Sequence, residues 1–246
     1  MSTPNRTPPA RGSRLVHTGQ VIVLQPVLEI QSRDGFALWP VAALEPYTFL
    51  PLSGALSQAE VGTAVMSIAA CNDMDPEGDD GPLSQRATDP LGAFLHGLLT
   101  MDPLFASGGL RMTDTATGVT LLPGCCNGLE ERGDWGEVLD GDGWASFGHD
   151  PSPVAERLGG TVRLTVDAEQ DDSPVIETTV TGLRPLLAGV ERDLTDFLRL
   201  VDAWAARHLP DHAVPVTTAL VRALAPPAPG AADGSAQEHG KEKAQT

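Results

Sequence analysis

The sequence predicts an α+β fold, in which an antiparallel sheet is packed by amphipathic helices. Two segments, 161–166 and 175–180, alternate apolar and polar residues at period two across an acidic turn, which is typical of paired antiparallel strands. Residues 183–208 instead place their apolar side chains on one stripe at helical spacing. The 246-residue chain is 41% hydrophobic, which is enough to bury the core of such a fold.

The N-terminal third is expected to supply strand segments and then a helix. Segments 21–24 and 27–30 have strand composition but are interrupted at Pro26, which favours an edge strand or a bulge because proline cannot donate to a ladder. Ser57-Gln58-Ala59-Glu60 has the pattern of a capping box, in which the first and last side chains satisfy each other's backbone amides. We therefore expect a helix over 58–71.

The middle of the chain is expected to form a second helix and a hairpin. Asp89-Pro90 introduces apolar residues at helical spacing, with proline in the first turn. Segments 110–113 and 119–122 form the strongest hairpin signal, with Gly118 suited to the left-handed position of their short connection.

We expect a single α+β domain over 15–224, which ends in a helix near 214–224. Residues 1–14 lack apolar periodicity, and residues 225–246 are rich in Pro, Ala, Gly and charge, so both ends are expected to be disordered.

The charge balance limits the classes of partner. The chain has 16 Lys and Arg against 33 Asp and Glu, a formal charge of −17. Such a field repels phosphates and anionic lipids, so we expect neither nucleic acid nor membrane as a partner. A basic protein surface is complementary to it, although strong acidity is also an ordinary route to solubility.

Composition and cysteine usage indicate a cytoplasmic protein from a GC-rich bacterium. No apolar run resembles a signal peptide or a bilayer span, since the longest mostly apolar run covers only 61–70. Three cysteines are an odd number, and the adjacent Cys125 and Cys126 can bridge only through a strained ring. Reduced thiols in a reducing compartment fit best.

The segment 121–151 concentrates the residues that favour a function. It predicts, first, a noncatalytic protein-binding surface, because turns and acidic residues surround two tryptophans that are expected to be exposed. The expected binding residues are Trp135, Trp144, Asp140 and Asp142.

The alternative is a cysteine-dependent hydrolase or a thiol sensor centred on Cys126 and His149. If Asn127 caps a helix with Glu130 at its third position, Cys126 lies at the positive end of the helix dipole, which would stabilise a thiolate. His149 could then act as a base, oriented by Asp150 or by another nearby aspartate. No recognised catalytic signature surrounds the cysteines, and two structural cysteines are a third interpretation.

The sequence predicts no metal site and no cofactor. The cysteines lack the C-x2-C and H-x3-H spacings of zinc sites. The acidic loop from Asp73 begins like an EF-hand, but Ser84 stands where the bidentate Glu is needed.

Residues 109–114 and 121–126, followed by Gly148-His149-Asp150-Pro151, resemble a family of uncharacterised proteins from high-GC bacteria that carries a Leu-Leu-Pro-Gly-Cys-Cys loop and a Gly-His-Asp-Pro segment. The resemblance covers about residues 40–210. It implies a cytoplasmic bacterial α+β protein and assigns no activity, cofactor or catalytic residue. In size, acidity and fold class the chain is also similar to immunity proteins that neutralise toxins, which implies a noncatalytic binding module.

Overall fold

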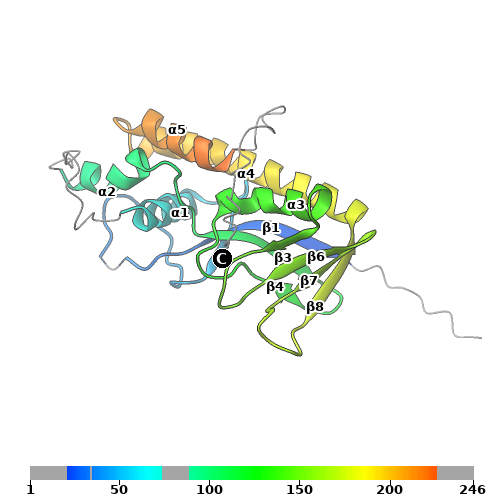
Figure 1. Ribbon diagram of the computed structural model, residues 1–246. Helices are drawn as coiled ribbons and strands as arrows, with labels where there is room; N and C mark the ends of the chain where they lie inside the picture. The colour runs from blue at the N-terminus through cyan, green and yellow to red at the C-terminus, as the bar shows by residue number, and fades with distance from the viewer. Residues whose placement is uncertain (1–20, 34, 74–88, 226–246) are drawn as a thin grey trace, which may run out of the picture.

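The computed structural model describes residues 21–33, 35–73 and 89–225 (Figure 1). The expected disordered ends and most of the acidic loop after Asp73 lie outside the described residues. Within the described part, five α-helices accompany two antiparallel four-stranded sheets, which confirms the predicted α+β class. Helices α4 and α5 run along one side of the molecule, and the strands lie on the other (Figure 1).

The first sheet has the strand order β2-β1-β3-β4. Its strands are β1 (Ile22–Glu29), β2 (Phe49–Pro51), β3 (Gly108–Asp114) and β4 (Thr120–Leu121). The predicted hairpin is confirmed by the antiparallel pairing of β3 with β4, and Gly118 adopts a positive φ of 75° in the connection. This hairpin places the Cys125–Cys126 segment directly after a paired strand.

Pro26 lies inside β1, an inner strand, so the prediction of an edge strand or bulge is wrong. The strand continues through Pro26, which stands opposite Leu110 of β3. The Pro26 carbonyl accepts from the Leu52 amide at 2.9 Å, so its nitrogen also faces the β2 side, where that short strand has ended. The missing N–H therefore removes no hydrogen bond to β3.

The second sheet is a meander with the order β5-β6-β7-β8. Its strands are β5 (Trp144–Ser146), β6 (Val154–Leu158), β7 (Thr161–Thr165) and β8 (Val175–Thr179). The predicted antiparallel pairing of the last two strands is confirmed.

The predicted helices are confirmed, with small changes at their ends. They are α1 (Gln58–Cys71), α2 (Pro90–Thr100), α4 (Val180–His208) and α5 (Ala213–Leu224). The Ser57–Glu60 capping box is formed at the start of α1. Helix α4 begins three residues earlier than expected, because the Thr179 hydroxyl accepts from the Gly182 amide at 3.0 Å and caps it there.

Apart from Val27, the buried hydrophobic side chains of the described residues form one continuous cluster that extends over both sheets and the helices. Helix α4 supplies Phe197, Val201 and Trp204, which have no exposed surface. Trp204 packs edge-on against Trp39, with ring centroids 5.5 Å apart. No helix within the described residues has the length and apolar character to cross a bilayer.

Candidate functional site

Backbone pairing between two loops brings the cysteines and His149 together. The Cys125 amide donates to the His149 carbonyl at 2.6 Å, and the His149 amide donates back to the Cys125 carbonyl at 3.2 Å. The Gly124 amide also donates to the Phe147 carbonyl at 2.8 Å. The segment after β4 and the segment after β5 therefore form a short antiparallel ladder with a cysteine opposite a histidine.

This pairing depends on one glycine in each loop. A Cβ atom on Gly124 would lie 2.2 Å from the Pro151 carbonyl oxygen and 2.6 Å from the His149 nitrogen. A Cβ atom on Gly148 would lie 2.6 Å from the Cys125 carbonyl oxygen, and Gly148 has a φ of +96°, which favours glycine. The glycines allow the close approach of the two backbones.

On its other side, the cysteine segment is bonded to the start of β3. The buried Asn127 side chain donates to the Gly108 carbonyl at 2.7 Å, and the Gly108 amide donates to the Asn127 carbonyl at 3.0 Å. The Leu129 amide likewise donates to the Ala106 carbonyl at 2.9 Å. The cysteines are thus held between two backbone pairings.

The predicted helix start at Asn127 is wrong, because its side chain is used by β3. The cap is Gly128, whose amide donates to the Glu131 carboxylate at 3.1 Å. The following element is the 3-10 helix η1 (Leu129–Gly133), and the helix α3 (Asp134–Asp140) begins only after it. Cys126 therefore does not lie at the entrance of an α-helix, and the expected dipole at its thiol is not present.

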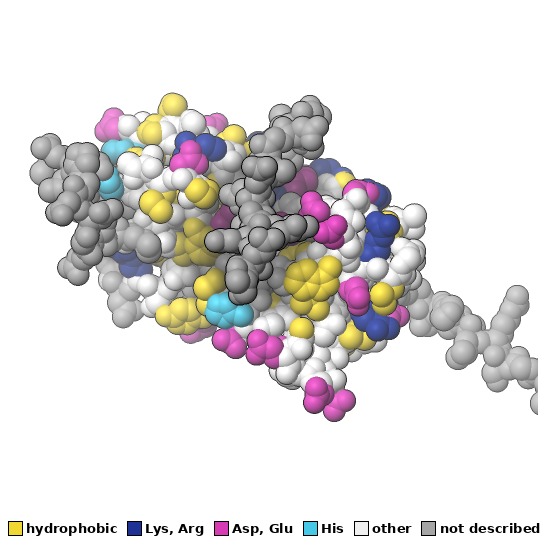
Figure 2. Space-filling view, viewed as in Figure 1, with side chains coloured by type: hydrophobic (Ala, Val, Ile, Leu, Met, Phe, Trp, Pro, Cys, Tyr) yellow, Lys and Arg dark blue, Asp and Glu magenta, His cyan; other side chains and the backbone are white. Residues whose placement is uncertain are grey.

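The side chains of Cys125, Cys126 and His149 converge at the surface. The two sulfurs are 3.5 Å apart, and the ligand atoms of all three residues lie within 4.8 Å of one another. All three residues are exposed. Figure 2 shows a His side chain on this face, bordered by hydrophobic and acidic side chains.

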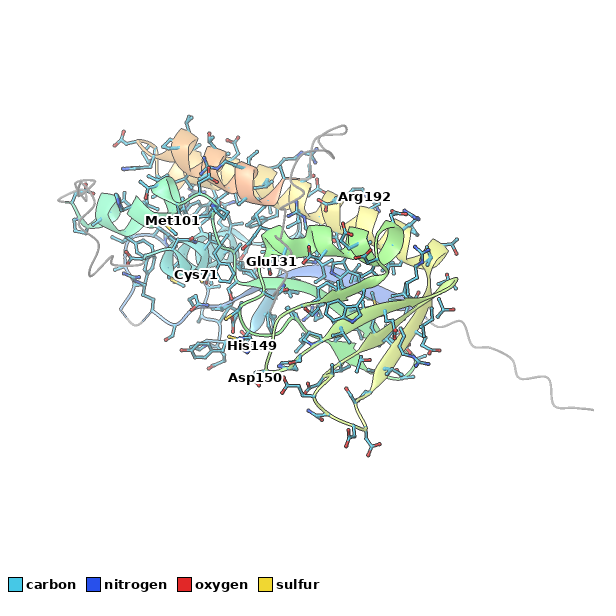
Figure 3. The ribbon with its side chains drawn as sticks, in the orientation of Figure 1. Cys71, Met101, Glu131, His149, Asp150 and Arg192 are labelled. Carbon is cyan, nitrogen blue, oxygen red and sulfur yellow. The ribbon has the colours of Figure 1, made fainter. Side chains whose placement is uncertain are left out.

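Asp150 is the acidic residue that the structure places beside the histidine. Its Oδ2 lies 3.4 Å from the His149 Nδ1, a long distance for a hydrogen bond between two exposed groups. Figure 3 shows His149 and Asp150 together on one face, whereas Cys71 lies apart from them toward the helices. The expected trio of Cys126, His149 and Asp150 is therefore close in space, with Cys125 added to it.

The thiols differ in their electrostatic surroundings. Hydrogen bonding with the neighbouring Cys126 thiol raises the pKa of Cys125, and Glu29 acts in the same direction. Burial raises the pKa of Cys71 to about 11, with smaller contributions from Glu29 and Glu130. Cys71 is thus a partly buried thiol, while the adjacent pair is exposed to solvent.

A small cavity of about 220 Å³ lies beside Cys125. Glu29, Tyr47 and Asp150 line it together with the Cys125 segment. Glu29 and Tyr47 could not be predicted from the sequence, because β1 and the chain before β2 reach the site only through the tertiary fold. Gly124 and Gly148 were not among the predicted site residues, and the signal for them is the glycine that each of the two motifs contains.

The predicted pair of exposed tryptophans is wrong for Trp135. This residue is only 2% exposed and stacks on Phe147, with ring centroids 4.5 Å apart. Trp144 is 55% exposed, as expected. Asp140 forms an ion pair with Arg184, which lowers the pKa of that carboxyl, and Asp142 is exposed.

No protein-family model matches the chain, and neither a curated protein nor a solved structure matches it. The site is therefore classified by its chemistry. It is an exposed dithiol and imidazole cluster between two loops of an α+β fold.

Proposed function

We propose that the protein is a thiol sensor, in which Cys125, Cys126 and His149 form the responsive site. The observation that carries the proposal is the convergence of these three exposed side chains within 4.8 Å. The sequence-based alternative was centred on Cys126 and His149, and the proposal adds Cys125 as a second thiol. The loop pairing supports it, because Cys125 itself forms two of the backbone hydrogen bonds between the loops, so a bulky group on its thiol would lie next to them.

A sensor fits this geometry better than a hydrolase. Nucleophilic catalysis needs a base within hydrogen-bond reach of an activated thiol and an oriented third group. Here the Asp150 Oδ2 lies 3.4 Å from the His149 Nδ1, so the imidazole has no close, oriented third group. The cavity of about 220 Å³ is also smaller than the roughly 300–1,000 Å³ typical of small-molecule sites.

The test compares alkylation of the three cysteines in the native, reduced protein, with each site quantified by mass spectrometry. We expect Cys125 and Cys126, which are exposed, to react readily, and Cys71, which is partly buried with a raised pKa, to react much more slowly. We also expect alkylation of the pair to speed amide hydrogen exchange at Cys125 and His149. Protection of the pair equal to that of Cys71, or unchanged exchange after alkylation, would contradict the proposal.

A second proposal is a noncatalytic, immunity-like module that binds a basic protein. The specific observation is the exposed Trp144 on the edge strand β5, opposite the exposed Glu156 and close in sequence to Asp142. An aromatic side chain with acidic neighbours fits a basic partner surface. The complex should weaken with salt and with Trp144→Ala, but not with Cys126→Ser. A partner whose binding is indifferent to Trp144→Ala would argue against this surface.

We further propose that the protein is a cytoplasmic bacterial protein that binds no nucleic acid. The three cysteines are free, which fits a reducing compartment. The formal charge of −17 opposes contact with a phosphate backbone. Fractionation of cells would test the location, and a gel-shift assay at low salt would test the exclusion of nucleic acid.

A further inference from the structure

We propose that Cys125, Cys126 and His149 bind a thiophilic divalent cation of the zinc class through two sulfurs and one imidazole nitrogen, with a fourth position open to solvent. The inference rests on the proposed thiol sensor, since it names the species that the thiols capture. Among the described residues, this is the one place where three Cys, His, Asp or Glu side chains bring ligand atoms so close together.

The separation of the sulfurs fits a shared ion. Cys125 Sγ and Cys126 Sγ are 3.5 Å apart. Two thiolates at about 2.3 Å from a tetrahedral zinc ion are separated by about 3.8 Å. A disulfide would need a separation of about 2.05 Å. The sulfurs therefore lie about 0.3 Å from the spacing of a chelating pair, given the zinc geometry, and much farther from that of a bond.

The histidine completes the site with only a side-chain adjustment. A sulfur and an imidazole nitrogen on one tetrahedral zinc ion are about 3.6 Å apart, whereas the ligand atoms here lie within 4.8 Å. The backbones of Cys125 and His149 are already fixed to each other by two hydrogen bonds. Because the side chains are exposed, rotation about their own torsions can close the remaining distance.

The surroundings favour a cation. Asp150 approaches the Nδ1 of His149, and a carboxylate beside a ligating histidine orients the ring and raises its basicity. Glu29 lines the cavity beside Cys125 and adds negative charge there. Three protein ligands leave a fourth position for water or a small ligand, as in open zinc sites and unlike closed structural sites, which use four protein ligands.

The direct test is titration of the full chain, reduced and stripped of metal, with Zn²⁺ and Cd²⁺. We expect one ion per chain by native mass spectrometry and an ultraviolet thiolate-to-cadmium charge-transfer band. Cys126→Ser should weaken binding by more than about 100-fold, since loss of an outer-shell partner alone costs about 10- to 100-fold. Asp150→Asn should fall within that smaller range.

Two variants serve as matched controls. Cys71→Ala removes a thiol outside the cluster, and His96→Gln removes an imidazole outside it, so both should bind Zn²⁺ and Cd²⁺ like the unaltered protein. Binding that survives Cys125→Ser combined with Cys126→Ser would place the ion elsewhere and overturn the inference.

Alkylation with and without Zn²⁺ separates failure of this inference from failure of the proposed function. If Zn²⁺ protects Cys125 and Cys126, both proposals are supported. If the pair reacts equally fast with and without Zn²⁺ and no cadmium band appears, the cation site is wrong while the thiol sensor stands. If the pair is protected in the metal-free protein, both are wrong.

Discussion

At the scale of single residues, Gly124 decides whether the two loops of the site can meet. Gly124→Ala should cost about 1–3 kcal/mol, the usual range for inserting an atom into occupied space, because the new Cβ would collide with the Pro151 and His149 backbones. Gly136→Ala is the control, since its Cβ meets nothing within 4 Å and lies in helix α3. That change should stabilise by about 0.5–1 kcal/mol. Chemical denaturation measures the free energy of unfolding of both variants. Equal changes would contradict the role of Gly124 in the close approach of the two loops.

Substitution of Trp135 and Trp144, which were predicted to share one binding surface, should affect stability very differently. Trp135→Ala removes a buried ring stacked on Phe147 and should cost about 3–5 kcal/mol. Trp144→Ala removes an exposed ring and should change the free energy of unfolding by less than about 0.5 kcal/mol. Similar losses in thermal unfolding would show that the surface assignment of Trp144 is wrong.

At the scale of elements, Arg132 ties three helical segments together. Its side chain is only 7% exposed and donates to Glu191 of α4 at 3.0 Å, and to the Leu224 and Ala225 carbonyls at the end of α5 at 3.0 and 2.8 Å. Arg132→Ala should cost about 1–3 kcal/mol, because it leaves two carbonyls and the Glu191 carboxylate, which is 33% exposed, without their donor. Arg163→Ala breaks an exposed pair with Glu177 and should cost about 1 kcal/mol or less. A similar melting temperature for both variants would contradict the role of Arg132 in holding η1 against α4 and α5.

The cap of α1 predicts a pH-dependent contribution to stability. Hydrogen bonds from the Ser57 amide and hydroxyl hold the pKa of Glu60 below its ordinary value of 4.5. This contribution is therefore complete above pH 4.5 and is lost as the pH falls through the lowered value. Ser57→Ala should cost about 1 kcal/mol at neutral pH and less in acid. A cost that is constant or grows on acidification would contradict this assignment.

The elements that could be predicted from the sequence are those whose signals are local. The capping box at Ser57, the Gly118 connection and the stripe of α4 are each determined by neighbours along the chain. The roles of Pro26 and Asn127 depend on distant strands and could not be predicted locally. Pro26 faces the position where β2 has ended, and the Asn127 side chain bonds to the start of β3. The same holds for the candidate site. The Cys125–Cys126 and His149 segments could be recognised in the sequence, but their pairing in space could not be predicted.

At the scale of the whole molecule, the continuous core predicts one cooperative unfolding transition. The single domain expected over 15–224 is tested by Leu95→Ala in α2 and Leu164→Ala in β7, both fully buried. Each should cost about 2–5 kcal/mol and lower one shared midpoint, followed by calorimetry and circular dichroism. Two transitions, each moved by only one of the variants, would show two independent cores.

The pairing of Cys125 with His149 also closes a loop over residues 126–148, which contains η1, α3 and β5. An ion held at this neck would restrict the unfolded chain as a covalent cross-link does, worth about 3 kcal/mol for a loop of roughly twenty residues. Unlike a disulfide, such a cross-link could be removed by a chelator. The availability of metal would then change the free energy of unfolding of the whole cooperative domain.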